Sequence, residues 1–232
     1  MAAQLAARGL TSSAQSLDAS CGFWALFGGS SNPEAAVKGL GSDYEILRNA
    51  FKPYACGVVV HPAIDGALAI RAEVPLQTIA SIEVRAHPLV LALTGKPRPQ
   101  TGLEGKFSIY HCAAAALIRG ACGPAEFTDA TVKDPQVVGL RDRVAVQEDE
   151  SLGEDEAVVR AILEDGATLT RHVAHATGSA SNPTSDTRLQ EKYVAMAGAV
   201  LGTGAASKLA ETVWSLEQVE DMGSVARTAA PR

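Results

Sequence analysis

The amino-acid sequence predicts an α+β fold, in which a small mixed α/β region is enclosed by helices. Short strand-like runs gather between residues 78 and 173, whereas the first residues and those beyond 186 follow a helical pattern. A turn-rich segment, ATGSASNPTSD (176–186), separates the strand-rich part from the last helices. This order predicts one α+β domain inserted into a helical one.

The first fifth of the chain has weak local patterns. Residues 2–8 indicate one or two helical turns that end at Gly9, and residues 10–20 form a serine-rich loop. GSSNPE (29–34) predicts a turn. We expect a short strand within Tyr44–Tyr54, interrupted by Pro53.

The central part begins with a helix and a strand. His61-Pro62 precedes a run with helical spacing, and proline suits the first helical turn because its missing N–H would be unpaired there. Residues 78–86 read as a strand. Residues 87–105 hold three prolines and three glycines, which predicts a long loop. The alanine-rich KFSIYHCAAAALIRG that follows predicts a helix ending at Gly120.

The remaining elements alternate before the chain becomes helical. A second helix is predicted within 124–141, interrupted near Asp134-Pro135, and RVAVQ, AVVRAIL and ATLTRHV predict strands. The last two flank Glu164-Asp165-Gly166, a hairpin signal because Asp-Gly accepts the positive φ of a tight turn. Helices are expected at 186–200 and 204–222, with Ser185 or Asp186 as the N-cap.

Charge and composition exclude several functional classes. The net charge is −6, but six of the 26 acids fall in QEDESLGEDE (147–156), which reads as a solvated loop. No basic stripe with interleaved aromatics is present, so nucleic acid is not an expected partner. No signal peptide and no apolar run of membrane-spanning length are present, so we expect no membrane association and a cytoplasmic protein.

Metal and nucleotide motifs also fail. TGLEGKFS lacks the first glycine of a phosphate-binding loop, and Phe107 stands where Ser or Thr must follow the lysine. His172 and His175 are three residues apart without a third ligand nearby, so they are predicted to be surface histidines. The four cysteines show no CxxC spacing and are predicted to be free thiols.

Three segments carry a resemblance to a known family: NAFKPYACGVVVHPAID (49–65), TGLEGKFSIYHCAAAALIRG (101–120) and GSASNPTSD (178–186). Together they resemble the MmgE/PrpD family, which includes 2-methylcitrate dehydratase and cis-aconitate decarboxylase. The resemblance implies that residues 1–40 end an N-terminal helical domain, that 41–182 form an α+β lid, and that 183–232 return to the all-helical domain. On this comparison the first half of the family sequence is missing, so we expect a homodimer or dependence on a separate helical half.

The resemblance also implies a reaction class. Family members dehydrate 2-methylcitrate, decarboxylate cis-aconitate or epimerise iminodisuccinate, and each reaction develops carbanion character next to a carboxylate. Such chemistry needs fixed cations and groups that exchange protons near neutral pH, but no metal or redox cofactor. We therefore expect a lyase, a dehydratase or decarboxylase, acting on a di- or tricarboxylate. The alternatives are an epimerase of the same family, or a non-catalytic lid or dimerisation module.

Two residues are predicted to be catalytic. Lys52 aligns with a family active-site lysine and would bind a carboxylate and stabilise charge, and Pro53 restricts its backbone to an extended form. His111 stands where the decarboxylase has an active-site tyrosine, and histidine exchanges protons near neutral pH where tyrosine does not. This difference from the family is an argument against assigning the decarboxylase or the dehydratase reaction to this chain. The alternative for His111 is a helix residue packed beside Cys112.

Three further residues are candidate substrate-binding groups. His61 lies just before a helix, where it would bind a substrate carboxylate or cap the helix. Ser108 is placed at the start of the next strong helix, where capping is favoured over ligand binding. Tyr110 completes the set within the same segment.

Overall fold

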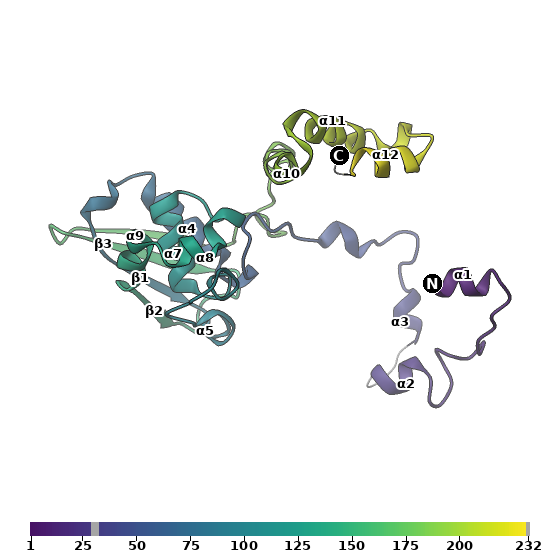
Figure 1. Cartoon of the computed structure of the whole chain (residues 1–232). Helices are drawn as coiled ribbons and strands as arrows, with labels where there is room; N and C mark the ends of the chain where they lie inside the picture. Colours follow the sequence, from purple (N-terminus) through teal and green to yellow (C-terminus); the bar gives the residue numbers. More distant parts are fainter. Residues whose placement is uncertain (29–32, 231–232) are drawn as a thin grey trace. The chain divides into compact units, whose positions relative to one another are not determined.

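The computed structural model describes residues 1–28 and 33–230, which form two compact units, Met1–Arg48 and Asn49–Arg232 (Figure 1). The first unit contains short helices only: α1 (Ala2–Ala6), α2 (Phe23–Phe27), α3 (Pro33–Val37) and a 3₁₀ turn (Glu45–Arg48). α1 confirms the helical turns predicted at 2–8. The turn predicted at 29–34 lies largely outside the described residues, and the domain boundaries near 40 and 182 stay predictions.

The second unit is built on a four-stranded mixed sheet, which confirms the α+β class. Its strands are β1 (Ile79–Ala86), β2 (Val144–Glu148), β3 (Ala157–Leu163) and β4 (Thr168–Val173), in the order β2-β1-β3-β4. β1 runs parallel to β2 and antiparallel to β3. β3 and β4 form the predicted antiparallel hairpin around Gly166, whose φ is +84°. All four strands agree with the predicted positions to within about two residues.

Three helices supply the core that packs on this sheet: α4 (His61–Arg71), α7 (Ile109–Arg119) and α9 (Pro135–Arg141). α4 contacts α7, β3 and β4, and α7 contacts α9 and β2 (Figure 1). Alternate residues of β1 are buried, as a half-covered strand requires. Close helix–sheet contact depends on small residues, because a Cβ at Gly66 would lie 2.6 Å from Cγ2 of Val159.

The strand expected within Tyr44–Tyr54 is wrong. Between the 3₁₀ turn and Tyr54 the chain is irregular, and its one backbone hydrogen bond to a remote segment runs from Phe51 N to Gly178 O at 2.8 Å. Pro53 has no N–H to donate to a ladder, so an apolar run around a proline does not join the sheet.

The long loop predicted at 87–105 is wrong in part, because it contains α5 (Pro88–Thr94) and α6 (Gly102–Gly105). Side chains cap both helices. Nδ1 of His87 accepts the Leu89 N–H at 3.1 Å, and the Thr101 hydroxyl accepts the Glu104 N–H at 3.2 Å. Both helices begin at these caps. The sequence analysis predicted a loop here because prolines and glycines are frequent in the segment.

The chain between α7 and β2 agrees with its prediction: a 3₁₀ turn (Pro124–Phe127) leads to α8 (Asp129–Val132), and Asp134 separates α8 from α9. Two further 3₁₀ turns lie at Val58–Val60 and Leu76–Thr78. Gly120 ends α7 as predicted, with φ +72°.

The last part of the chain is helical, with α10 (Asp186–Leu201), α11 (Thr203–Trp214), a 3₁₀ turn (Leu216–Gln218) and α12 (Met222–Thr228). Ser185 caps α10, because its hydroxyl accepts the Arg188 N–H at 3.3 Å. The second predicted helix, 204–222, is too long, since Ser215 leaves the helical region and Asp221 caps a new helix. Within the described residues, no helix has the length and apolarity that a membrane span requires.

Candidate functional site

A cleft of 720 Å³ lies in the second unit, between the irregular segment before α4 and one face of α10. Its lining residues come from 52–57, from parts of the segments 103–107 and 120–124, from Leu68 and from α10. The cleft therefore brings together four segments that are distant in the sequence, and the first two lie in segments that carry the family resemblance.

The lining of this cleft is mostly apolar, and its charged residues are all cations. Lys52, Lys106, Arg188 and Lys192 line it, and no aspartate or glutamate does. Within the part of the chain that the structure describes, none of these four side chains forms an ion pair with a carboxylate. Several cations in a concave surface without counter-charges attract anions, since their potentials add. The cleft is therefore suited to a ligand with more than one negative charge.

The backbone around Lys52 is fixed from two sides. Phe51 donates its N–H to Gly178 O at 2.8 Å, and the Lys192 ammonium donates to the carbonyl oxygen of Lys52. Gly178 has φ +87°, and a Cβ there would lie 2.1 Å from Phe51 O, so only glycine permits this contact. Together with Pro53, these contacts hold Lys52 at the rim of the cleft.

Cys56 lines the same cleft, although its side chain is almost completely buried from bulk solvent. The residues on either side of it anchor its backbone: Ala55 N donates to Cys122 O at 2.9 Å, and Gly57 N donates to Lys106 O at 3.0 Å. Hydrogen bonding with the Cys112 side chain lowers the pKa of Cys56 to about 6, against the opposing effect of burial. His61 and the charge of Lys52 add to this lowering.

His61 is the first residue of α4 and is buried, with an exposed fraction of 1%. Its ring packs edge-to-face against Tyr54, with ring centroids 5.2 Å apart. It makes no capping hydrogen bond, so the capping alternative is wrong. Its Nε2 atom is buried without a hydrogen-bond partner within the described structure.

Ser108 is the N-cap of α7, which confirms the capping alternative. Its hydroxyl accepts the His111 N–H at 3.1 Å and donates to Lys96 O at 2.6 Å. Both partners are backbone groups of this chain, and Ser108 has no exposed surface. Tyr110, two residues later, is half-buried and packs against the core.

His111 is completely buried, and its Nε2 atom lies 2.9 Å from Glu126 O. Its ring packs against Phe127, with centroids 5.7 Å apart. Burial lowers the pKa of His111, which keeps the ring neutral at physiological pH.

The structure thus places one predicted site residue in the lining of the cleft and four outside that lining. Lys52 lines the cleft, whereas His61, Ser108, Tyr110 and His111 are not among its lining residues. The substrate-binding and catalytic roles of all five residues stay predictions.

Sequence reasoning missed four residues that line the cleft: Cys56, Lys106, Arg188 and Lys192. A signal was present for two of them. Arg188 and Lys192 are four residues apart on a predicted helix, which places both on one face. No local pattern marked Cys56.

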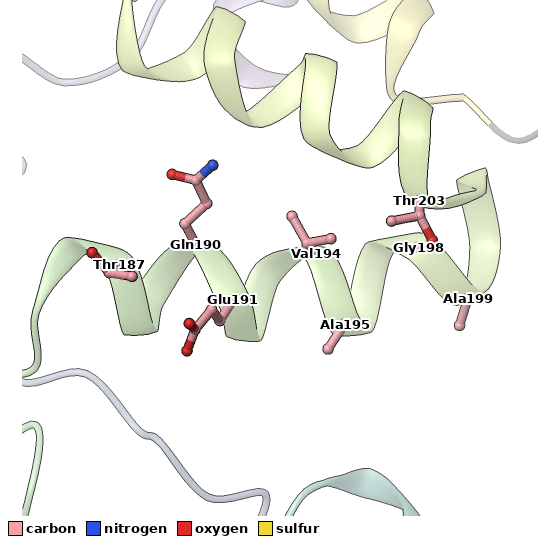
Figure 2. A pocket seen from close by; sticks show the side chains of 8 residues that line it. All are labelled: Thr187, Gln190, Glu191, Val194, Ala195, Gly198, Ala199 and Thr203. Carbon is pink, nitrogen blue, oxygen red and sulfur yellow. The ribbon is translucent and has the colours of Figure 1, made fainter.

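A second hollow, of 760 Å³, lies along α10 and differs in character. It is lined by residues of that helix together with Thr203, and Glu191 is its one charged lining residue. In Figure 2, Gln190 and Val194 point to one side of the helix and Glu191 and Ala195 to the other. These side chains lie on two sides of the helix and do not converge, so this hollow is not a candidate active site.

Metal-ligand clusters are absent from the described residues, where no group of three or more suitable side chains occurs. His172 and His175, which the sequence analysis assigned to the surface, are exposed. Nε2 of His172 lies 2.6 Å from a Glu156 oxygen, and Nδ1 of His175 lies 2.9 Å from an Asp155 oxygen. The surface prediction is confirmed.

Comparisons with known proteins identify the family. A family model, the MmgE/PrpD C-terminal domain, matches residues 54–218. A cis-aconitate decarboxylase of Aspergillus terreus (strain NIH 2624 / FGSC A1156) is 25% identical over 206 residues, covering 82% of this chain and 42% of that protein. A human cis-aconitate decarboxylase is 28% identical over 235 residues, covering 95% of this chain and 48% of that protein. The chain therefore spans less than half the length of these relatives.

Proposed function

Because the chain belongs to the MmgE/PrpD family, we propose that it supplies the polycarboxylate-binding wall of a lyase. The observation that carries this proposal is the cleft lined by Lys52, Lys106, Arg188 and Lys192 without a carboxylate. A di- or tricarboxylate brings two or three negative charges, and such a lining offers each of them a partner.

The same four cations would also stabilise the negative charge that develops during the proposed reaction. Removing a proton or CO₂ next to a carboxylate leaves negative charge on carbon and oxygen, and fixed cations stabilise that charge most when they need not reorganise. Lys52 suits this role because it lines the cleft and contacts on both sides fix its main chain. In this proposal Lys52 stabilises the developing charge, and Arg188 and Lys192 hold the remaining carboxylates.

Proton transfer is assigned to His111, as the sequence analysis predicted. Its neutral ring is the form that accepts a proton, but the ring lies outside the lining of the cleft. Its participation therefore requires a change in the packing around Phe127 or a relay through an intervening group. His61, Ser108 and Tyr110 also lie outside the lining of the cleft, so their proposed substrate-binding roles likewise require a change in local packing.

The relatives make cis-aconitate the first substrate to test, and 2-methylcitrate and iminodisuccinate follow from the other reactions of the family. Each acid would be incubated with the chain and followed by ¹H NMR. We expect one of them to be consumed, and Lys52→Ala to slow its consumption at least about tenfold. Unchanged consumption in the variant would contradict the proposal, and so would failure of the chain to bind any of the three acids.

A non-catalytic function is the second candidate, and a different observation favours it. α10 has no buried residue, and the exposed Glu191, Ala195 and Ala199 point away from α11 in Figure 2. An uncovered helix face of this kind is typical of a surface that docks another chain, including a second copy in a homodimer. Light scattering separates the candidates: a concentration-dependent dimer that lacks turnover supports the docking module.

A further inference from the structure

Three exposed apolar side chains line the cleft beside its cations. Leu103 is 69% exposed, Phe107 48% and Met196 50%, although burial stabilises side chains of this kind. Leu103 lies in α6, Phe107 lies two residues after that helix, and Met196 lies on α10. We call these three residues the apolar group of the cleft. Apolar side chains that gather in a concave surface and stay exposed are typical of a ligand site.

Cations and apolar side chains follow one another along α10. Four of its residues line the cleft: Arg188, Lys192, Ala195 and Met196. Their spacing places them on one face of the helix, and Met196 lies about 12 Å beyond Arg188 along the helix axis. A smaller hollow of 160 Å³ includes Arg188 and Lys192 but neither Ala195 nor Met196. The side of the cleft that α10 forms therefore changes from charged to apolar along its length.

The cleft is larger than a compact polycarboxylate requires. Pockets of about 300–1,000 Å³ enclose drug-sized ligands, and the volume of this cleft, 720 Å³, is within that range. The carboxylates of a compact acid find partners among the cations but none in the apolar group, because a buried charge needs a polar partner. A hydrocarbon substituent on the acid does find partners there, since its contact with the apolar group removes both from water.

We propose that the cleft selects di- and tricarboxylates that carry an apolar chain. The carboxylates bind the cations, and the chain packs against the apolar group. A chain of about four or more carbons covers the rise of about 6 Å between Lys192 and Met196. This inference rests on the proposed function, because the cations proposed there hold the carboxylates. It goes further by naming the class of acid, which is alkyl-substituted and not compact.

Calorimetric titration of the whole chain with succinate, methylsuccinate and butylsuccinate tests this selection. The three acids carry the same two carboxylates and differ in the length of the chain. We expect Kd to fall about threefold for each added methylene, so that butylsuccinate binds at least about tenfold more tightly than methylsuccinate. The dimethyl ester of butylsuccinate has the chain without the charges, and we expect it to bind at least about tenfold more weakly than the acid.

A double variant assigns the effect of chain length to the apolar group. Leu103→Gln with Met196→Gln changes two exposed side chains, and we expect it to remove most of the difference between methylsuccinate and butylsuccinate. The affinity for succinate should stay unchanged, since the cations are intact. Val200→Gln is the matched control, because Val200 is an exposed residue of the same helix that does not line the cleft. It should leave all three affinities unchanged.

The outcomes separate this inference from the proposed function. Equal affinities for methylsuccinate and butylsuccinate in the wild-type chain overturn the inference, whereas binding of succinate leaves the proposed function standing. If none of the acids binds, both fail. If the double variant instead lowers self-association in light scattering, and chain length has no effect, a second copy of the chain covers the apolar group and the inference is wrong.

Discussion

Nε2 of His111 lies 2.9 Å from the carbonyl oxygen of Glu126, which joins helix α7 to the 3₁₀ turn that follows it. The ring is completely buried, and burial lowers its pKa. His111 is thus a neutral group in the core, and its protonation state is coupled to the stability of the fold.

This coupling predicts a pH dependence. The unfolded chain takes up a proton at His111 near pH 6.5, whereas the folded chain resists it, so the free energy of unfolding decreases as the pH falls below about 6.5. In His111→Gln this contribution is lost, at most about 1.4 kcal/mol per pH unit. Urea unfolding at pH 7.5 and 5.5 measures it. Parallel pH profiles for wild type and variant would show that the ring is not held neutral by the fold.

The contact between Gly178 and Phe51 predicts a strong response to a single methyl group. In Gly178→Ala the new Cβ would lie 2.1 Å from Phe51 O at a φ of +87°. We expect a loss of about 2 kcal/mol or more in the free energy of unfolding, because backbone atoms must move. The movement displaces Lys52, so polycarboxylate affinity falls as well.

Gly166→Ala is the matched control for this substitution. Gly166 has a similar φ of +84°, but a Cβ there meets no atom within 4 Å. We expect it to cost about 1 kcal/mol, from backbone conformation alone. Equal losses in the two variants would show that the contact with Phe51 has no effect of its own.

Asp65 links Tyr54, in the segment that lines the cleft, to the turn-rich segment after β4. Its carboxylate accepts the hydroxyl of Tyr54 and the N–H of Thr177, the latter at 2.7 Å. Burial, together with the hydrogen bond to Asp65, raises the pKa of Tyr54. We expect Asp65→Asn to lower the free energy of unfolding by about 1–3 kcal/mol in a denaturant titration. Glu164→Gln, at the exposed hairpin turn, should change it by less than about 0.5 kcal/mol.

The sheet could be predicted from the sequence because its signals are local. Asp165-Gly166 fixes the hairpin between β3 and β4, and the apolar runs on either side define both strands. α5 was missed although His87-Pro88 repeats the His61-Pro62 pattern that had predicted α4. The prolines and glycines after α5 led to the prediction of a loop instead, because the same residue types occur in loops and at the ends of short helices.

The cleft was only partly predictable. Lys52 was found through a resemblance, whereas its partner Lys192 lies 140 residues further along the chain. Helical spacing places Arg188 and Lys192 on one face but does not show what that face meets. The burial of His111 was also not visible, since a histidine in an alanine-rich helix has the same pattern whether it faces a cleft or the core.

The central claim is that the cleft binds polycarboxylates through its cations, and calorimetric titration of the chain with tricarballylate, an unreactive tricarboxylate, tests it most directly. We expect binding that weakens with added salt, that falls at least about tenfold in the Lys52→Met, Arg188→Gln double variant, and that is unchanged in Lys208→Met. Equal affinity in wild type and double variant, or tricarballylate binding no tighter than acetate, would contradict the account.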